Sequence, residues 1–438
     1  MPKSTTYEIN PPRERAFLVG AELKQERPLL PVEESLDELA RLADTAGLEV
    51  VGRITQRFDR PNPATYIGPG KVEEVKMLVE ETEADVIIFD DELTPRHQRE
   101  LEKIFGDETK LLDRTALILD IFALHAQTHE GKLQVELAQL EYRLPRLTRM
   151  WTHLARQAGG RAGGGNGGVG LRGPGETQLE ADRREIGQRI SHIKSQLEVV
   201  RARRGRHRAK RQQTELRVVA IVGYTNAGKS TLLNCLSGAN VLEADMLFAT
   251  LDPTTRRVVL PSGQEVLFTD TVGFIQKLPT QIVAAFRATL EEIQDADVLL
   301  HVVDTTHPHA LAQVEAVEDT LATLEVDHLP LVVALNKADL LPKDADPIAD
   351  LGVEDPAVVV SARTGIGIDA LLTTLEASLT QYLQPLHVML PYKRGDLVGM
   401  LYERGQVDAE THSEEGVEIY GRLPARLFPY FETYRLDD

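Results

Sequence analysis

The chain reads Gly223-Tyr224-Thr225-Asn226-Ala227-Gly228-Lys229-Ser230 near its middle. The apolar residues 216–222 before this segment predict a strand, and the residues from Thr231 onward predict a helix. Glycines at both ends let the backbone turn sharply, so that its N–H groups point inward at the start of the helix. A loop of this kind binds phosphate groups. Lys229 is then expected to reach the β and γ phosphates, and the Ser230 hydroxyl to bind Mg²⁺.

Three later strings each follow an expected strand. They are Asp270-Thr271-Val272-Gly273, Asn336-Lys337-Ala338-Asp339 and Ser361-Ala362-Arg363. In the first string, the aspartate is expected to hold Mg²⁺ through water and the glycine N–H to contact the γ phosphate. In the second, the carboxylate can accept hydrogen bonds from N1 and N2 of guanine, a donor pair that adenine lacks. The asparagine is expected to tie this loop to the phosphate loop, and the Ala362 N–H to reach the guanine O6. Four strings in this order predict GTP and GDP binding.

A mobile segment is expected between the first two strings. It reads Phe248-Ala249-Thr250-Leu251-Asp252-Pro253-Thr254-Thr255-Arg256 and should supply a threonine to Mg²⁺ when GTP is bound. Thr250 is the nearest candidate, with Thr254 and Thr255 as alternatives.

The sequence lacks the glutamine that orients water after the Asp-x-x-Gly string in many GTPases. Phe274 occupies that place and cannot hydrogen-bond water. We therefore expect slow intrinsic hydrolysis in which Lys229, Thr250 and Gly273 take part. Asn226 is a candidate ligand for a monovalent cation such as K⁺; alternatively, it only shapes the phosphate loop.

The chain of 438 residues is expected to be α/β, a P-loop GTPase domain flanked by two others. We expect an N-terminal α/β domain over 1–113, a helical hairpin over 114–213, the GTP-binding domain over 214–384 and a small α+β domain over 385–438. Residues 114–156 and 176–213 predict two long helices, the first bent near Pro145. Residues 159–175 contain ten glycines and form the expected tip.

The net charge is −19, yet residues 142–211 hold seventeen Lys and Arg against five Asp and Glu. This basic region predicts contact with RNA, the alternatives being a solvated helix face or a linker. The candidates are Arg143, Arg146, Arg149, Trp151, Arg156, Arg161, Arg172, Arg203, Arg204, Arg206 and Arg208.

Composition excludes several classes of protein. Hydrophobic residues make up 42% and charged residues 27%, so the chain is neither fibrous nor wholly disordered. Cys235 is the only cysteine, which excludes an intrachain disulfide and suits a reducing compartment. No apolar run reaches the ~20 residues of a membrane span. We expect a cytoplasmic protein, monomeric in solution, with a peripheral membrane fraction as an alternative.

With these residues assembled, the chain resembles the HflX family of ribosome-associated GTPases. Besides the nucleotide strings, the resemblance rests on residues 66–71 (Tyr-Ile-Gly-Pro-Gly-Lys), 112–115 (Leu-Asp-Arg-Thr), 139–147, 173–180 and 248–253. It covers the chain from about residue 15 onward.

The resemblance implies a GTPase that binds the large ribosomal subunit and splits or rescues stalled or idle ribosomes under stress. It implies nucleotide contacts at 223–230, 248–252, 270–273, 336–339 and 361–363, with Ser230 and Thr250 as Mg²⁺ ligands. Thr231, directly after Ser230, is a further candidate for nucleotide contact. Two other functions stay open, namely a ribosome-assembly GTPase acting on precursor particles and a signalling GTPase whose hairpin docks a protein.

Overall fold

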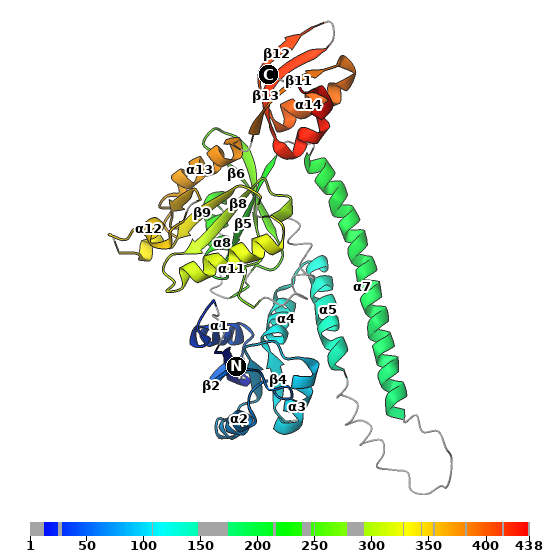
Figure 1. The fold of residues 1–438 in the computed structure, drawn as a ribbon, viewed down its shortest axis with the longest axis vertical. Helices are drawn as coiled ribbons and strands as arrows, with labels where there is room; N and C mark the ends of the chain where they lie inside the picture. Colours follow the sequence, from blue (N-terminus) through cyan, green and yellow to red (C-terminus); the bar gives the residue numbers. More distant parts are fainter. Residues whose placement is uncertain are drawn as a thin grey trace, which may run out of the picture. The chain divides into compact units, whose positions relative to one another are not determined.

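The computed structural model describes residues 13–24, 29–106, 108–147, 174–212, 216–238, 247–248, 250–277, 293–326, 328–342, 344–353, 355–381, 383–413 and 416–436. The chain divides into two compact units. Figure 1 labels the helices and strands that are named below. The first comprises Met1–Glu198 with two segments from later in the chain, Met246–Leu251 and Lys277–Phe286. The second comprises Val199–Asp245, Asp252–Gln276 and Arg287–Asp438.

The first unit contains a four-stranded parallel sheet of order β2-β1-β3-β4, which confirms the expected parallel α/β domain. Its strands are β1 (Arg15–Leu23), β2 (Glu49–Phe58), β3 (Val86–Phe89) and β4 (Lys110–Asp113). Its helices are α1 (Val32–Thr45), α2 (Pro69–Glu81), α3 (Pro95–Phe105), α4 (Arg114–His125) and α5 (His129–Arg143). Apolar residues of β1 and β3 pack against α2 and α3 in one buried core.

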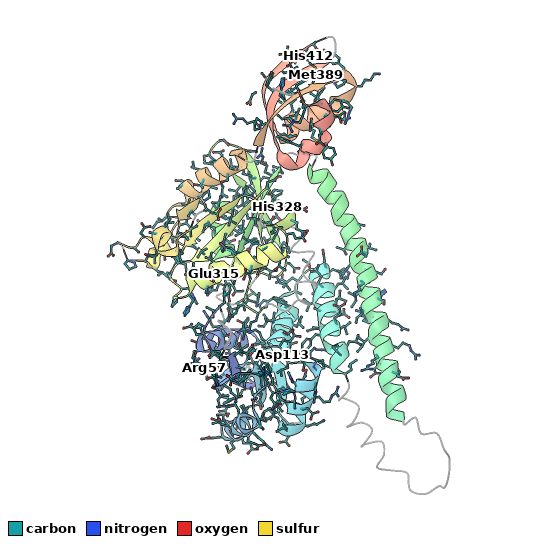
Figure 2. The ribbon with its side chains drawn as sticks, in the orientation of Figure 1. Arg57, Asp113, Glu315, His328, Met389 and His412 are labelled. Atoms are coloured by element: carbon teal, nitrogen blue, oxygen red, sulfur yellow. The ribbon has the colours of Figure 1, made fainter. Side chains whose placement is uncertain are left out.

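Side-chain caps begin several of these helices. Thr94 accepts a hydrogen bond from His97 N at the start of α3, where Pro95 takes the first helical position. Asp113, labelled in Figure 2, ends β4 and caps α4 by accepting from Ala116 N at 2.8 Å. Its second oxygen accepts from Leu93 N at 2.9 Å. Burial nevertheless raises the pKa of this carboxyl.

The expected long helix over 114–156 is instead two helices within the described residues. α4 ends at His125, and α5 begins after Thr128, whose hydroxyl accepts from Gly131 N. Pro145 lies in a short 3-10 helix, η1 (Leu144–Arg146). A threonine cap in mid-pattern starts a new helix because it satisfies the free N–H groups there.

α7 (Pro174–Gln212) is the second long helix that the sequence predicted. Leu133 and Leu137 of α5 and Ile193 and Leu197 of α7 form a small buried cluster. Ion pairs flank it, Arg189 with Glu136 and Lys194 with Glu141. The helices are therefore paired as expected; the tip, residues 159–175, lies outside the described residues except for its last two positions.

The second unit carries a six-stranded sheet of order β10-β9-β8-β5-β7-β6. Its edge strand β6 runs antiparallel and forms a hairpin with β7. Its strands are β5 (Arg217–Gly223), β6 (Thr254–Val259), β7 (Glu265–Asp270), β8 (Val298–Asp304), β9 (Leu331–Asn336) and β10 (Ala357–Val359). Its helices include α8 (Lys229–Ser237), α11 (Ala310–Thr323), α12 (Pro347–Leu351) and α13 (Ile368–Gln381). This is the doubly wound arrangement of a P-loop domain.

The C-terminal residues form the expected small α+β piece. An antiparallel sheet of order β11-β13-β12 packs against α14 (Gly395–Arg404). Its strands are β11 (Leu383–Leu390), β12 (Gln406–His412) and β13 (Val417–Pro424). Pro385 lies inside β11, which is an edge strand, where the missing N–H of proline is tolerated.

None of the helices in the described ranges combines the length and the apolar character that crossing a bilayer requires.

Candidate functional site

The predicted nucleotide strings meet at one edge of the second sheet. β5, β7 and β9 are parallel within it, and each ends where a predicted string begins. Loops that follow neighbouring parallel strands come together at the carboxyl edge, which is where α/β sheets bind ligands. The topology thereby joins segments separated by more than a hundred residues.

Two glycines of the phosphate loop are required by close backbone approach. Gly223 has φ +145°, and a Cβ there would lie 2.3 Å from the carbonyl oxygen of Val302. Gly228 has φ +93°, and a Cβ there would lie 2.4 Å from Asn336 Nδ2. No other residue fits either place without displacing its neighbours. Asn226 between them also adopts a left-handed conformation, with φ +62°.

Lys229 is held inside its own loop. Its ammonium group donates to the carbonyl oxygens of Gly223 at 3.0 Å and of Tyr224 at 2.8 Å. Burial lowers the pKa of Lys229 to about 8, although the charge of Asp270 opposes the shift. Burial disfavours the charged form of this ammonium group, and a nearby anion would favour it. Lys229 is therefore suited to bind an anion such as a phosphate group.

The predicted Mg²⁺ residues Ser230 and Asp270 are in direct contact. Ser230 Oγ donates to Asp270 Oδ2 at 2.7 Å, and Asp270 is almost fully buried. A hydroxyl and a carboxylate are hard oxygen donors of the kind that Mg²⁺ binds. The pair therefore fits the ion. Thr271 next to it donates to Ile221 O at 2.7 Å, which fixes the end of β7 against β5.

The segment after Asp270 is hydrogen-bonded to the phosphate loop. Thr225 N donates to Phe274 O at 2.8 Å, and Phe274 N donates to Gly223 O at 3.0 Å. The Tyr224 hydroxyl accepts from Gln276 N at 3.0 Å. A Cβ on Gly273 would lie 2.9 Å from Lys229 Nζ, so this glycine closely approaches the lysine.

Asn336 joins three of the four strings. Its Nδ2 donates to Ala227 O at 2.9 Å, and its Oδ1 accepts from Ala362 N at 2.9 Å. The first bond is the tie to the phosphate loop that the sequence predicted. The second links the string at 336–339 to the string at 361–363, so one buried amide sets the spacing of all three loops.

The predicted guanine-binding carboxylate is positioned by a serine. Ser361 Oγ donates to Asp339 Oδ1 at 2.7 Å, while Thr364 N donates to Ser361 Oγ at 3.2 Å. Lys337, at φ +67°, forms an ion pair with Asp304 at 2.6 Å. Ala362 is buried and Arg363 exposed. The binding roles of these residues stay predictions.

Sequence reasoning missed two residues of this site. Asp304 ends β8 and holds Lys337; its place at a strand end was a usable signal. His301 lies on β8 and is 1% exposed. Burial, with a smaller effect of Lys229, lowers its pKa to about 4. A histidine within an apolar run gives no signal of this kind.

The predicted mobile segment is divided between the two units. Phe248, Thr250 and Leu251 belong to the first unit, and Asp252 begins the next part of the second. Phe248 and Leu251 are buried, and Thr250 is partly exposed. Ala249 lies outside the described residues. Thr250 therefore stays a prediction as a Mg²⁺ ligand.

The RNA-contact candidates are only partly described. Arg149, Trp151, Arg156, Arg161 and Arg172 lie outside the described residues. The backbone of α7 carries Arg203, Arg204, Arg206 and Arg208, whose side chains are likewise not described. Arg143 ends α5 and is exposed.

Arg146, another candidate for RNA contact, makes its contacts within the first unit. Its side chain is 8% exposed. It donates to Leu93 O at 2.6 Å and to Tyr142 O at 3.0 Å, and its guanidinium lies 3.6 Å from the centre of the Tyr142 ring. These contacts commit the charge to the packing of the first unit.

Four family models match successive parts of the chain. Their descriptions are "GTP-binding GTPase N-terminal" over residues 33–123, "GTP-binding GTPase Middle Region" over 125–211, "50S ribosome-binding GTPase" over 218–337 and "HflX C-terminal domain" over 351–426. Together they span the chain from α1 to β13.

Relatives named GTPase HflX match nearly the whole chain. The protein of Caldanaerobacter subterraneus subsp. tengcongensis is 47% identical over 415 residues, covering 95% of this chain and 92% of its own. That of Escherichia coli K12 is 42% identical over 414 residues, covering 94% of both chains. A GDP complex of a GTP-binding protein from Sulfolobus solfataricus aligns with a TM-score of 0.43 at 24% identity, covering 84% of this chain and 99% of that one. The 47% and 42% identities to the two HflX relatives, each over more than nine-tenths of the chain, make this chain a member of the HflX family of GTPases.

Proposed function

We propose that this protein is a GTP hydrolase that binds the large ribosomal subunit and, by switching between GTP and GDP states, splits or rescues stalled or idle ribosomes under stress. Asn336 carries the nucleotide part of the proposal, because its two hydrogen bonds hold the phosphate loop and both guanine loops together. The ribosomal part rests on the family, one of whose models is described as a 50S ribosome-binding GTPase.

Base selection follows from Asp339. Its carboxylate is oriented by Ser361 and offers acceptors to N1–H and the N2 amine of guanine. The Ala362 N–H, which the sequence predicted to reach O6 of the base, donates to Asn336 Oδ1 in this structure, so it would have to share or exchange that bond to meet O6. Adenine offers no such donor pair, so the carboxylate would keep only its hydrogen bond from Ser361 and adenine would bind more weakly than guanine.

Phosphate binding follows from the loop between β5 and α8. Its inward N–H groups and the helix N-terminus favour the α and β phosphates, and Lys229 the β and γ phosphates. Ser230 and Asp270, with Thr250, would hold Mg²⁺, which when bound offsets charge on the phosphates. The Gly273 N–H would meet the γ phosphate and so distinguish GTP from GDP.

Hydrolysis is expected to be slow without a partner. Phe274 is buried, 3% exposed, and its ring has no group to orient water. Stimulation by the ribosome would supply the missing orientation. Asn226 is exposed at the loop and remains the candidate ligand for K⁺. Equal turnover in potassium and sodium buffers would exclude that role.

Sedimentation with purified ribosomal subunits tests the proposal. The full chain should co-sediment with large subunits when loaded with a non-hydrolysable GTP analogue, and much less with GDP or without nucleotide. Ser230→Ala, which removes a Mg²⁺ and phosphate ligand, should lose the difference. Light scattering of intact ribosomes then measures splitting. Attachment that ignores the nucleotide, or no attachment, would refute the proposal.

A further inference from the structure

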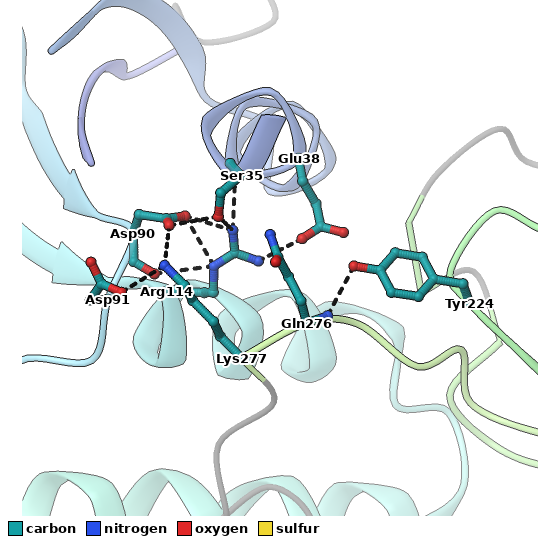
Figure 3. A network of polar contacts seen from close by, with 8 residues as sticks. All are labelled: Ser35, Glu38, Asp90, Asp91, Arg114, Tyr224, Gln276 and Lys277. Atoms are coloured by element: carbon teal, nitrogen blue, oxygen red, sulfur yellow. Dashed lines mark hydrogen bonds and ion pairs between the residues drawn. The ribbon is translucent and has the colours of Figure 1, made fainter. Parts of the chain in front are cut away.

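Helix α4 of the first unit has a fully buried cation at its first position. Arg114 is 1% exposed. Its Nη1 donates to Glu38 at 2.8 Å, and its Nη2 donates to Asp90 at 2.6 Å and to the Ser35 hydroxyl at 3.1 Å (Figure 3). A guanidinium so deeply buried must keep its carboxylate partners, so it fixes the start of α4 against α1 and the end of β3.

Lys277 shares a carboxylate with Arg114. Its ammonium lies 2.5 Å from Asp90 Oδ2 and 2.6 Å from Asp91 Oδ1, and all three residues belong to the first unit (Figure 3). Burial alone would raise the pKa of Asp90, but Arg114 and Lys277 outweigh it and lower that pKa to about 2. Asp90 is therefore a shared anion, held by the helix on one side and by Lys277 on the other.

Phe248 makes an apolar contact with the same helix. Its ring is 4.7 Å, centre to centre, from that of Phe122 on α4, in an edge-to-face arrangement. Both rings are buried, as are Leu247 and Leu251 beside Phe248. An edge-to-face aromatic pair adds orientation to the burial of apolar area.

Both contacts come from segments next to the predicted γ-phosphate sensors. Phe248 precedes Thr250 by two residues, and Lys277 follows Gly273 by four. Each contact residue has a left-handed backbone, φ +58° at Phe248 and φ +54° at Lys277. Residues other than glycine rarely adopt this conformation, and those that do are concentrated at active sites and switch regions.

We propose that α4 is the element on which both switch segments act, with Lys277 and Phe248 as the positioning residues that attach them to it. The inference rests on the proposed function, since it requires these segments to respond to GTP. α4 leads through Ala126–Thr128 into α5, and α5 packs on α7 through the cluster of Leu137, Ile193 and Leu197. A shift of α4 thereby reaches the helices that carry the basic residues.

Nucleotide affinities separate this role from simple stabilisation. Contacts that hold the fold equally in both states change the Kd values for GDP and for a GTP analogue by the same factor. Contacts that differ between the states change the ratio of the two. We would measure both Kd values by calorimetry for the full chain and for Lys277→Met, Phe248→Leu and the double variant.

The ratio should change by roughly fivefold or more in each single variant, the lower range of ordinary allosteric coupling. Both changes should have the same sign, and the double variant should change the ratio by less than their product, because the two contacts share one helix. Lys277→Arg, which keeps the positive charge, should leave the ratio of the two Kd values close to that of the natural chain. Lys103→Met, which removes an exposed ion pair with Glu100, and Leu124→Ala, an exposed residue of α4, are the matched controls.

Hydrogen exchange on the same proteins gives a second readout. Amides of residues 114–125 should exchange differently with GTP analogue and with GDP in the natural chain, and alike in Lys277→Met. An unchanged ratio in the variants, changes of opposite sign, or equal exchange of α4 in both states of the natural chain would overturn the inference. Ribosomes are absent from this experiment, so a chain that binds guanine nucleotides with an unresponsive α4 refutes the inference and leaves the proposed function standing.

Discussion

At the scale of single residues, several side chains of the second unit have one identifiable task each. Asn336 spaces three loops, Ser361 aims Asp339, and Asp304 holds Lys337. Changes to single side chains should therefore have separable effects.

Asp339→Asn should change the preferred base from guanine to xanthine. The amide cannot accept both hydrogen bonds from guanine, so the affinity for GDP should fall by roughly a hundredfold or more, the loss expected for two hydrogen bonds to a charged group. Xanthine nucleotides, which present an oxygen in place of the N2 amine, should gain affinity. Calorimetry with both nucleotides checks this. Asp344→Asn, an exposed residue of the same loop region, is the control and should bind GDP normally.

His301 should make stability depend on pH. Its pKa is lowered to about 4, so the folded chain keeps it neutral where the unfolded chain protonates it below about 6.5. The unfolded state then binds more protons between these values, and stability should fall as pH drops from 6.5 to 4, by about 3 kcal/mol in all. Denaturant unfolding of His301→Leu should show a flatter pH profile over this window.

A pH profile for His301→Leu equal to that of the natural chain would contradict this assignment. The Asp90 carboxylate does not interfere, because its lowered pKa contributes stability that is lost only as pH falls from about 3.8 to 2.

At the scale of elements, the loop between β5 and α8 depends on backbone conformation more than on side chains. Gly223 and Gly228 both have positive φ and both face another chain segment at less than 3 Å from a Cβ position. The glycines are therefore constrained twice, once by conformation and once by space. A glycine at the other end of α8 separates the two effects.

Gly228→Ala should weaken nucleotide binding, whereas Gly238→Ala should not. Both positions are left-handed, φ +93° and φ +64°, so each substitution costs about 1–2 kcal/mol of strain. Only at Gly228 does the new Cβ meet Asn336 Nδ2, at 2.4 Å; at Gly238 nothing lies within 4 Å. GDP affinity should fall at least ~10-fold in the first variant alone, the loss of one hydrogen bond to Ala227 O. Equal affinities would show that Asn336 does not set the loop.

At the scale of the whole molecule, charge is unevenly distributed along the chain. The chain carries a net charge of −19, while the region 142–211 is strongly basic. Part of that basic charge is already paired within the chain: the side chain of Arg146 is mostly buried, and the exposed Arg189 forms an ion pair with Glu136. Only the exposed remainder is free to meet RNA phosphates, and its contribution should depend on salt.

The substitutions Arg143→Ala and Arg146→Ala should therefore change different properties, ribosome attachment in the first case and stability in the second. The first should weaken attachment to large ribosomal subunits and reduce the salt slope by about 1, as for one phosphate contact, with stability unchanged. The second should cost about 1–3 kcal/mol of stability, because Leu93 O is left without its buried donor. Sedimentation at several salt concentrations and denaturant unfolding distinguish them. A salt slope unchanged by Arg143→Ala would remove that residue from the proposed contact.

Three features can be predicted from local sequence patterns: the strand–loop–helix of residues 216–237, the order of the nucleotide strings and the parallel α/β domain before them. These follow from local signals, since glycine spacing, apolar periodicity and caps act over a few residues. The sequence also indicated the tie between Asn336 and the phosphate loop, because that chemistry needs an amide at that place.

Which charged side chains are paired inside the fold depends on tertiary packing and could not be predicted from the sequence. Arg146 looked like its exposed neighbours in sequence, and Arg114, Asp90 and Lys277 lie on three separate segments with no periodicity in common. Packing alone brings these groups together and removes them from water. An arginine reads the same in sequence whether it faces solvent or a buried carboxylate, because burial is a property of the folded chain and not of its local pattern.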